Sequence, residues 1–191
     1  MGYTTDFVGH LNTSRVLTSE EVQFIQKFND VRHMRRDVDK LHELYHGKHG
    51  NPFAKTKEEI YGREGEYFVG GESNDGSILD YNEPPGTPAR TDDFMKDWNL
   101  RQEKIKTGES VPGLWCQWTV DINGTRLEWD GGEKFYNYTE WLKYLIDHFF
   151  EKWEVKLNGQ INWEGEDRSD IGQIIVNENT ITIKTGKVVY S

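Results

Sequence analysis

The 191-residue sequence predicts an α+β fold with a largely antiparallel sheet built from hairpins. Strand-like segments of the second half are separated by short turns, whereas parallel strands need a crossover of about a dozen residues or more. Two segments have apolar residues at helical spacing and are expected to pack on the sheet as its main helices. Six of the seven tryptophans lie between Trp115 and Trp163, so this half is expected to hold most of the core. The length suits one domain spanning residues 1–191 better than two.

The N-terminal segment predicts a strand followed by a helix. In residues 3–10 (YTTDFVGH), alternate positions carry Tyr3, Thr5 and Phe7, which favours a strand with these side chains on one face. Thr18 and Glu21 have the spacing of a capping box, in which each side chain satisfies a free backbone N–H group at the start of a helix. The helix that follows carries apolar residues about one turn apart, at Val22, Ile25, Phe28 and Val31.

The next segment, residues 32–66, is strongly polar and rich in histidine. We expect a short helix at 37–46 that ends at Gly47, and a short strand at 67–69. Because the rest of the segment has no apolar periodicity, it is expected to be irregular and solvated.

A long surface loop and an inserted helical arm are expected after this polar segment. Residues 72–90 (ESNDGSILDYNEPPGTPAR) consist largely of turn-forming residue types, which predicts the loop. Thr91 is expected to cap a helix that carries Phe94, Met95 and Trp98, and Gly108 and Pro112 are expected to end it. The insertion therefore spans residues 91–112.

The tryptophan-rich half begins with a predicted hairpin. Leu114, Cys116, Trp118 and Val120 alternate with Trp115, Gln117 and Thr119, which predicts a strand with two unlike faces. Asn123-Gly124 is a strong signal for a two-residue turn, and Leu127 and Trp129 should lie on the returning strand.

A helix and two further hairpins complete the predicted fold. Residues 138–152 have a wide apolar face and predict the longest helix, with Asn137 and Glu140 at its start. Asn158-Gly159 predicts a second hairpin turn. The segments 171–176 and 180–183 predict a third hairpin around residues 177–179.

Composition narrows the possible partners and compartments. The formal net charge of −10 and the pI near 5.1 disfavour nucleic acid as a partner, because binding to a phosphate backbone requires clustered Lys and Arg. The single cysteine, Cys116, is flanked by aromatic residues and is expected to be a core thiol. We expect no membrane association and a cytoplasmic location in a bacterial host cell, since the sequence begins without a leader pattern and contains no long apolar run.

One motif indicates an enzyme. His42-Glu43-Leu44-Tyr45-His46 has the H-E-x-x-H pattern of zinc peptidases, in which two histidines bind zinc and the glutamate activates water. Glu66, twenty residues after His46, is available as a third ligand. The polar surroundings and the expected helix end at Gly47 disfavour the rigid, dry site that catalytic zinc needs. Our preferred interpretation is therefore a solvated helix with no catalytic residue, metal or cofactor, and the alternative is a zinc metallopeptidase with Glu43 as catalytic base.

Acidic residues surround several of the tryptophans and suggest a binding surface. Aromatic faces that are surrounded by carboxylates attract cations, so the expected ligand is a basic peptide or an amine. Paired carboxylates beside indoles also occur in glycosidases, and the same tryptophans could instead be core residues. The predicted binding residues of this type are Trp115, Trp118, Trp129, Asp130, Glu133, Trp163, Glu164, Glu166 and Asp167.

Five phrases of the sequence, GYTTDF, GLWCQW, EWDGGEKFYNYTEWL, WEGED and DIGQIIV, resemble a family of small uncharacterised proteins encoded by bacteriophages and bacteria. The resemblance covers nearly the whole chain and implies a phage or bacterial setting, with no assigned catalytic residues.

In that setting we expect a non-enzymatic binding protein with an accessory or anti-defence role. Its partner is expected to be a host or phage protein, or a small molecule such as a nucleotide. Contacts to nucleotide phosphates require arginine or lysine. The best candidates are Arg32, Arg35, Arg36 and Arg63.

Overall fold

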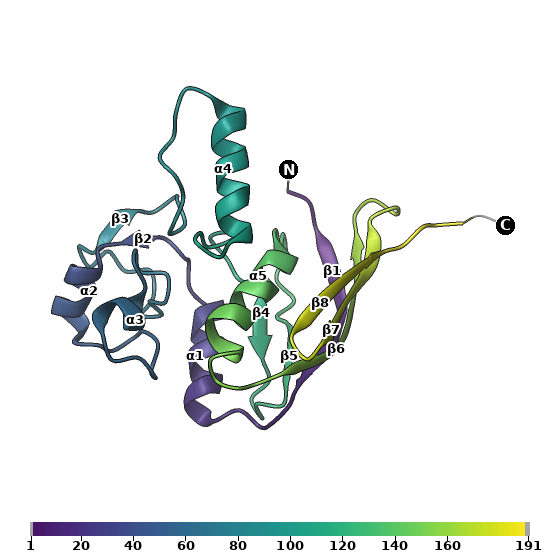
Figure 1. Cartoon of the computed structure of the whole chain (residues 1–191), viewed down its shortest axis with the longest axis horizontal. Coiled ribbons are helices and arrows are strands. Elements are labelled where there is room, and N and C mark those ends of the chain that lie inside the picture. Colours follow the sequence, from purple (N-terminus) through teal and green to yellow (C-terminus); the bar gives the residue numbers. More distant parts are fainter. Residues whose placement is uncertain (1, 190–191) are drawn as a thin grey trace. The chain divides into compact units, whose positions relative to one another are not determined.

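The computed structural model describes residues 2–189 and confirms an α+β fold with a large antiparallel sheet (Figure 1). The chain divides into two compact units. Residues 1–25 and 117–191 form the first, here called the sheet unit, and residues 26–116 form the second, here called the insert unit. Helix α1 (Ser19–Asn29) crosses the boundary between them. The prediction of one domain spanning residues 1–191 stays a prediction.

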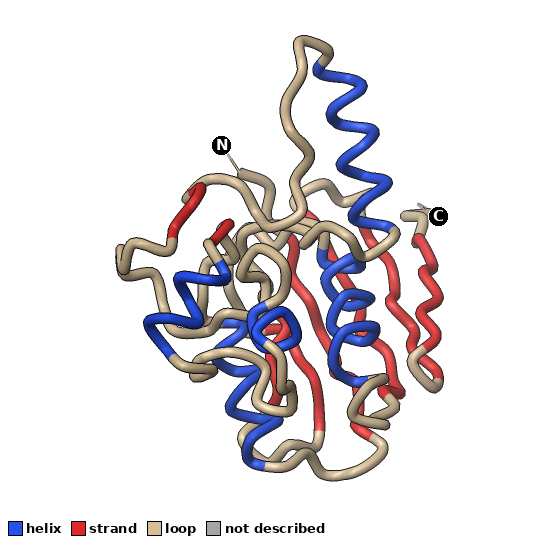
Figure 2. The backbone as a smooth tube through the Cα atoms, turned by 60° about the vertical axis from the view of Figure 1, so that its left-hand side comes forward, coloured by secondary structure: helices blue, strands red, loops and turns tan. Residues whose placement is uncertain are grey.

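The sheet unit contains six antiparallel strands in the order β4-β5-β1-β6-β7-β8, which run side by side in Figure 2. Their bounds are Thr5–Thr13 (β1), Trp118–Val120 (β4), Arg126–Trp129 (β5), Leu157–Gly165 (β6), Ile171–Asn177 (β7) and Thr180–Thr185 (β8). The predicted strand at 3–10 is β1, and its alternation is confirmed for Thr5 and Phe7, which are buried while Asp6 and Val8 are exposed. Tyr3, predicted on the same face, lies outside the strand and is exposed.

Helix α5 (Tyr138–Leu145) and the π-helical turn η1 (Ile146–Phe150) cover the apolar face of this sheet. Tyr138 at the start of α5 contacts Phe7 of β1, with ring centroids 4.8 Å apart. Fully buried side chains on the helix include Trp141, Leu142, Leu145, Phe149 and Phe150. The predicted helix at 138–152 is therefore confirmed, except that its last turn widens to a π-helix.

The predicted turns of the sheet unit were partly wrong. The β7–β8 hairpin is confirmed, since Glu178 (φ 49°) and Asn179 (φ 68°) adopt the left-handed conformation that a two-residue type I′ turn requires. The β4–β5 loop is longer than predicted and spans 121–125, because the carboxylate of Asp121 accepts hydrogen bonds from the backbone N–H groups of Thr125 and Arg126.

Asn158-Gly159 makes no turn, and both residues lie inside β6. Gly159 has φ 148°, and a Cβ atom there would lie 2.6 Å from the carbonyl oxygen of His10 on β1. This glycine therefore permits two strands to approach closely. Asn137 also differs from the prediction, because it has φ 54° and its side chain makes no cap hydrogen bond to α5.

The insert unit has short elements and a small apolar core. They are β2 (Arg35–Arg36), α2 (Val38–Tyr45), α3 (Lys57–Tyr61), β3 (Ile78–Asp80) and α4 (Phe94–Lys106). This small core consists of Leu41, Ile60, Tyr61 and Phe68, with Val38, Tyr45 and Ala54 packed against it. Other apolar side chains of the unit, among them Phe28, Met34, Val111 and Cys116, are also buried. Residues 67–69, predicted as a strand, form none, because Phe68 and Val69 are buried as parts of an irregular segment.

The predicted N-cap residues can be compared with the structure at the starts of α1 and α4. The capping box of Thr18 and Glu21 is confirmed by hydrogen bonds in both directions. On α4, in contrast, the N-cap is Asp93 rather than the predicted Thr91. Thr91 instead donates two hydrogen bonds to the carboxylate of Asp97, one from its backbone and one from its hydroxyl.

Buried polar groups complete the insert unit. Arg36 is only 2% exposed, and its guanidinium donates hydrogen bonds to Asp75, Ser77 and the carbonyl of Gly71. Burial lowers the pKa of Arg36, and the Asp75 carboxylate opposes this effect. The guanidinium also lies 4.6 Å from the ring centroid of Phe68, so the buried charge packs directly on the small core.

His33 is a second buried polar group. Its Nε2 atom lies 2.9 Å from the carbonyl oxygen of Phe28, and its ring contacts the Phe28 ring in a tilted arrangement at a centroid distance of 4.1 Å. Burial lowers the pKa of His33 to about 4, although hydrogen bonds to the backbone of Phe28 and Glu66 act in the opposite direction. The imidazole is therefore neutral at pH 7.

Within residues 2–189, no helix is both long and apolar enough to cross a membrane.

Candidate functional site

The most distinctive exposed group of side chains is a stack of Arg32 with two aromatic rings, here called the Arg32 stack. The guanidinium carbon of Arg32 lies 4.4 Å from the ring centroid of Tyr81 and 6.0 Å from that of Trp115. Tyr81 is 45% exposed and Trp115 is 41% exposed. A cation over an aromatic face is attracted by the ring quadrupole, so the three side chains hold one another in place at the surface.

Backbone hydrogen bonds bring these three residues together from distant parts of the insert unit. The N–H group of His33, the neighbour of Arg32, donates to the carbonyl of Leu114, the neighbour of Trp115. On the other side, β2 pairs with β3, and Tyr81 follows directly after β3. The Arg32 Nε atom also donates to the carbonyl oxygen of Tyr81 at 3.0 Å. The stack is therefore fixed to the backbone as well as by its rings.

The predicted strand at 114–120 begins only at Trp118 in the structure, but burial alternates along the segment from Trp115 onward as predicted. Cys116, Trp118 and Val120 are buried, and Trp115 occupies a position of the opposite set. A side chain of the opposite set points away from the core. Arg32 and Trp115 were each predicted as binding residues, but Tyr81 was not. Tyr81 lies in the predicted loop 72–90, which in the structure contains strand β3.

The Arg32 guanidinium has unused hydrogen-bonding capacity. Its Nε atom donates to Tyr81, while among residues 2–189 no carboxylate lies within ion-pair distance of its terminal nitrogens. Planar guanidinium groups bind carboxylates or phosphates through two parallel hydrogen bonds. The Arg32 stack can therefore bind an anionic group on its polar edge and an apolar or aromatic group on its faces.

The other predicted arginines are arranged differently. Arg35 is bound by Glu64 through two hydrogen bonds, of 2.6 and 3.2 Å, and Arg36 is buried against Asp75. Arg63 is exposed and borders two cavities, of about 360 and 400 Å³.

In both cavities, carboxylates outnumber the cationic side chains that line them. The smaller cavity is lined by Glu64, Glu66, Glu109, Arg63 and Lys104, and the larger by Asp37, Asp39, Glu58, Glu64, Arg36, Lys57 and Arg63. This balance does not favour the binding of a polyphosphate.

Two of the predicted binding tryptophans are buried, as is the predicted arginine Arg36, which corrects the prediction for these residues. Trp118 is fully buried and its Nε1 donates to the carbonyl of Tyr138, and Trp163 is 6% exposed and donates to the carboxylate of Asp170. Trp129 is half-buried, and its Nε1 donates to Gln117. Since Phe7 contacts both Trp118 and Trp129 edge-on, these indoles belong to one aromatic core.

The predicted acidic residues lie beside this core at the surface, and two of them, Asp130 and Asp167, bind the backbone of their own turns. Asp130 accepts from Gly132, Glu166 accepts from Thr4, and Asp167 accepts from Ser169. Glu133 and Glu164 are exposed. Carboxylates in such turns stabilise the turn itself, which was the alternative interpretation of these phrases.

The H-E-x-x-H segment is exposed. Helix α2 ends at Tyr45, and His46 has the left-handed conformation (φ 52°) of a C-cap residue. His42, Glu43 and His46 are exposed, and Glu43 forms an ion pair with Lys40. Glu66 instead accepts a hydrogen bond from the backbone of Glu64. Among residues 2–189, no group of three or more His, Cys, Asp or Glu side chains is arranged to hold a metal ion.

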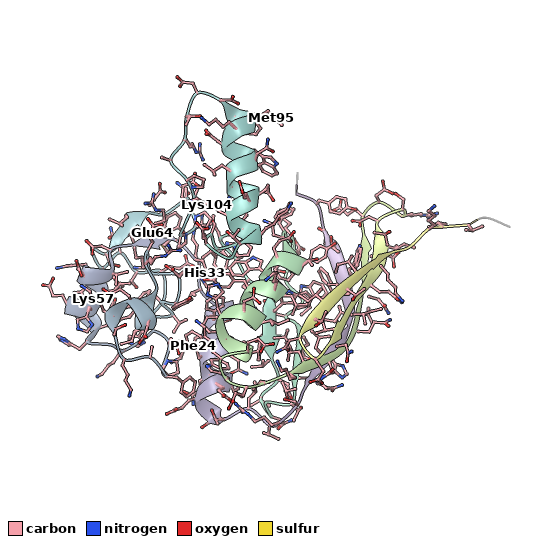
Figure 3. All side chains as sticks on the ribbon, in the orientation of Figure 1. Phe24, His33, Lys57, Glu64, Met95 and Lys104 are labelled. Atoms are coloured by element: carbon pink, nitrogen blue, oxygen red, sulfur yellow. The ribbon has the colours of Figure 1, made fainter. Side chains whose placement is uncertain are left out.

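Helix α4 carries a second exposed apolar surface, which was not among the predicted binding residues. Phe94, Met95 and Trp98 are 75%, 61% and 50% exposed, whereas Ile105 near the end of the helix is buried. Figure 3 labels Met95 on this helix. The helical spacing of Phe94, Trp98 and Ile105 was visible in the sequence, but only the structure shows which part of that stripe is covered.

No protein-family model, curated protein or solved structure matches the chain. The resemblance to phage and bacterial proteins therefore stays a prediction.

Proposed function

We propose that this is a non-enzymatic binding protein that recognises another protein through the Arg32 stack. The observation that carries the proposal is the exposed Tyr81-Arg32-Trp115 arrangement, with one guanidinium beside two aromatic rings. Arginine, tyrosine and tryptophan are the residue types most enriched among the residues that dominate binding energy at protein interfaces.

The rigidity of the stack supports this use. Ordering a long side chain on binding costs about 0.5–1.5 kcal/mol, and a side chain that is already ordered avoids that cost. Arg32 is ordered by its bond to the Tyr81 carbonyl and by both rings. Because these side chains lose little conformational entropy on binding, more of their interaction energy contributes to affinity.

Charge and shape define the expected partner. The free guanidinium edge can bind a carboxylate or phosphate, and the exposed rings can contact an apolar or aromatic group. None of the three described cavities is lined by Arg32, Tyr81 or Trp115, whereas small-molecule sites are usually concave. We therefore favour a host or phage protein that presents an acidic and an apolar side chain together, in an accessory or anti-defence setting, over a nucleotide.

Affinity capture with matched variants tests the proposal. Wild-type protein is incubated with lysate of the bacterial host, and captured proteins are compared with those retained by Trp115→Ala and Arg32→Gln. Trp98→Ala is the control, because it removes an exposed indole of the insert unit outside the stack. A partner that is lost with the first two variants and kept with the control supports the proposal.

Loss of that partner with the control alone would assign recognition to α4 instead. A nucleotide panel examined by thermal melting covers the small-molecule possibility. If a nucleotide raises the Tm of the wild type but not of Trp115→Ala, the ligand of the Arg32 stack is a nucleotide and not a protein.

A further inference from the structure

Strand β8 leaves one edge of the six-stranded sheet open. It is the last strand in the order and pairs only with β7 among the described residues. Ile183 of β8 is 43% exposed, although Ile174, its partner on β7, is fully buried. On this face of the sheet, the apolar side chains of β7 are therefore covered, whereas Ile183 on β8 remains partly exposed.

The register of the β7–β8 pair shows which backbone groups are free. The N–H group of Gly186 donates to the carbonyl of Ile171, and antiparallel ladders alternate between bonded and non-bonded pairs. Thr180, Thr182 and Lys184 therefore direct their backbone groups toward β7. Ile181, Ile183 and Thr185 direct theirs away from the sheet. An exposed edge of this kind is a template for another strand.

We propose that β8 pairs in antiparallel fashion with β8 of a second copy of the chain, around a two-fold axis at Ile183. In this register the N–H and C=O groups of Ile183 bond to those of Ile183 in the second copy, and Ile181 lies opposite Thr185. All six free-edge positions of the two strands are then paired. The two sheets become one continuous sheet of twelve strands.

Charge complementarity supports a second copy as the occupant. Residues 180–189 contain Lys184 and Lys187 and no carboxylate, which makes this edge cationic in a chain of net charge −10. In the proposed register, Lys184 lies opposite Thr182, so no two lysines face each other. Lys187 lies beside Glu178 of the second copy, the acidic residue of the β7–β8 turn. By symmetry this ion pair forms twice.

Light scattering and sedimentation over a range of protein concentrations test the oligomeric state. We expect a dimer in the wild type and a monomer in Ile183→Lys, because an inward-facing lysine on an edge strand blocks strand pairing. Ile122→Lys, at a position of the β4–β5 loop that is 84% exposed, is the matched control and should remain dimeric. A wild type that is monomeric at every concentration would overturn the proposal, as would a dimer that Ile183→Lys leaves intact.

Charge reversal tests the register without altering the strand. Lys187→Glu should weaken the dimer about tenfold, since it replaces two exposed attractions by two repulsions. Adding Glu178→Lys should restore the dimer. A double variant that is as weak as the single variant would contradict this register.

Hydrogen exchange identifies the surface that pairs. In the dimer the amides of Ile181, Ile183 and Thr185 should exchange slowly, and in Ile183→Lys the amides of Ile181 and Thr185 should exchange fast, while Thr182 and Lys184 stay protected in both. Equal exchange at Ile181 and Thr185 in both proteins would overturn the proposal. Trp115→Ala should leave the dimer unchanged, so this test is independent of the proposed function.

Discussion

The two units are stabilised in different ways. The sheet unit has a core of large apolar side chains, with Trp118, Trp141, Phe149 and Phe150 fully buried. The insert unit also buries apolar side chains, among them Phe28, Met34 and Leu41, but in addition it buries the cation Arg36 and the imidazole of His33. Apolar burial responds little to pH, whereas buried polar groups depend on their protonation and on their partners. The stability of the insert unit should therefore depend on pH and on single hydrogen bonds more strongly than that of the sheet unit.

The largest expected effect is in the sheet unit. Trp118→Ala should lower its free energy of unfolding by about 4 kcal/mol, because it removes a fully buried indole and leaves a cavity. Denaturant unfolding at pH 7 and at pH 5 measures this loss, which should be the same at both pH values. A loss that changes strongly between them would contradict an apolar origin.

The second largest expected effect is the loss of insert-unit stability at acidic pH. His33 has a pKa of about 4 in the folded chain and an ordinary value of 6.5 when unfolded, so the unfolded state binds more protons between these values. Its contribution is fully present above pH 6.5 and is lost as the pH falls toward 4, by roughly 3 kcal/mol. Hydrogen exchange of the insert-unit amides at a series of pH values follows this loss.

A pair of histidine variants identifies the group responsible. His33→Leu should flatten the pH dependence of the insert unit between pH 6.5 and 4, because an apolar side chain cannot be protonated. His42→Gln, at an exposed position of the same unit, should leave it unchanged. An unaltered pH profile in His33→Leu would refute the assignment to His33.

Loss of the buried guanidinium should have a smaller effect. Arg36→Met should destabilise the insert unit by about 2 kcal/mol, because Asp75 loses one partner but keeps its hydrogen bonds from Ser77 and Tyr45. Lys57→Met, a half-buried lysine on α3 whose ion pairs with Asp39 and Glu58 are at the surface, should cost less than about 1 kcal/mol. Equal unfolding free energies for the two variants would show that the buried network adds little stability.

Chelation should have the smallest effect. EDTA should leave the Tm unchanged, and protein purified without a histidine tag should contain no stoichiometric zinc, because we expect His42 and His46 to bind no metal. One zinc ion per chain that is lost in His42→Gln would favour the metallopeptidase alternative. Peptide cleavage that disappears in Glu43→Gln would establish it.

Local signals in the sequence predicted much of the sheet unit. Capping by Thr18 and Glu21 and the turn at Glu178-Asn179 depend on neighbouring residues, so sequence spacing was sufficient. Gly159 was misread as a turn because its role depends on a strand far away in sequence. Thr56 and Glu59 also have the spacing of a capping box and form one at the start of α3, a helix that was not predicted.

The insert unit was harder to predict because its contacts join distant polar residues. No periodicity indicates that Arg36 is buried by Asp75 and Ser77. For the same reason, Arg32 and Trp115 could be identified as candidates, but their proximity and the role of Tyr81 could not. Trp118 and Trp163 were assigned to a surface because composition alone does not distinguish a buried indole from an exposed one.

The most direct test of the proposed function is the affinity of one captured partner for wild-type protein, Trp115→Ala and Trp98→Ala. Removing an anchor of about 2 kcal/mol raises the Kd about thirtyfold. We predict this increase for Trp115→Ala, with the Kd of Trp98→Ala within about twofold of the wild type and with unchanged unfolding curves for both. Equal Kd values for wild-type protein and Trp115→Ala would contradict recognition through the Arg32 stack.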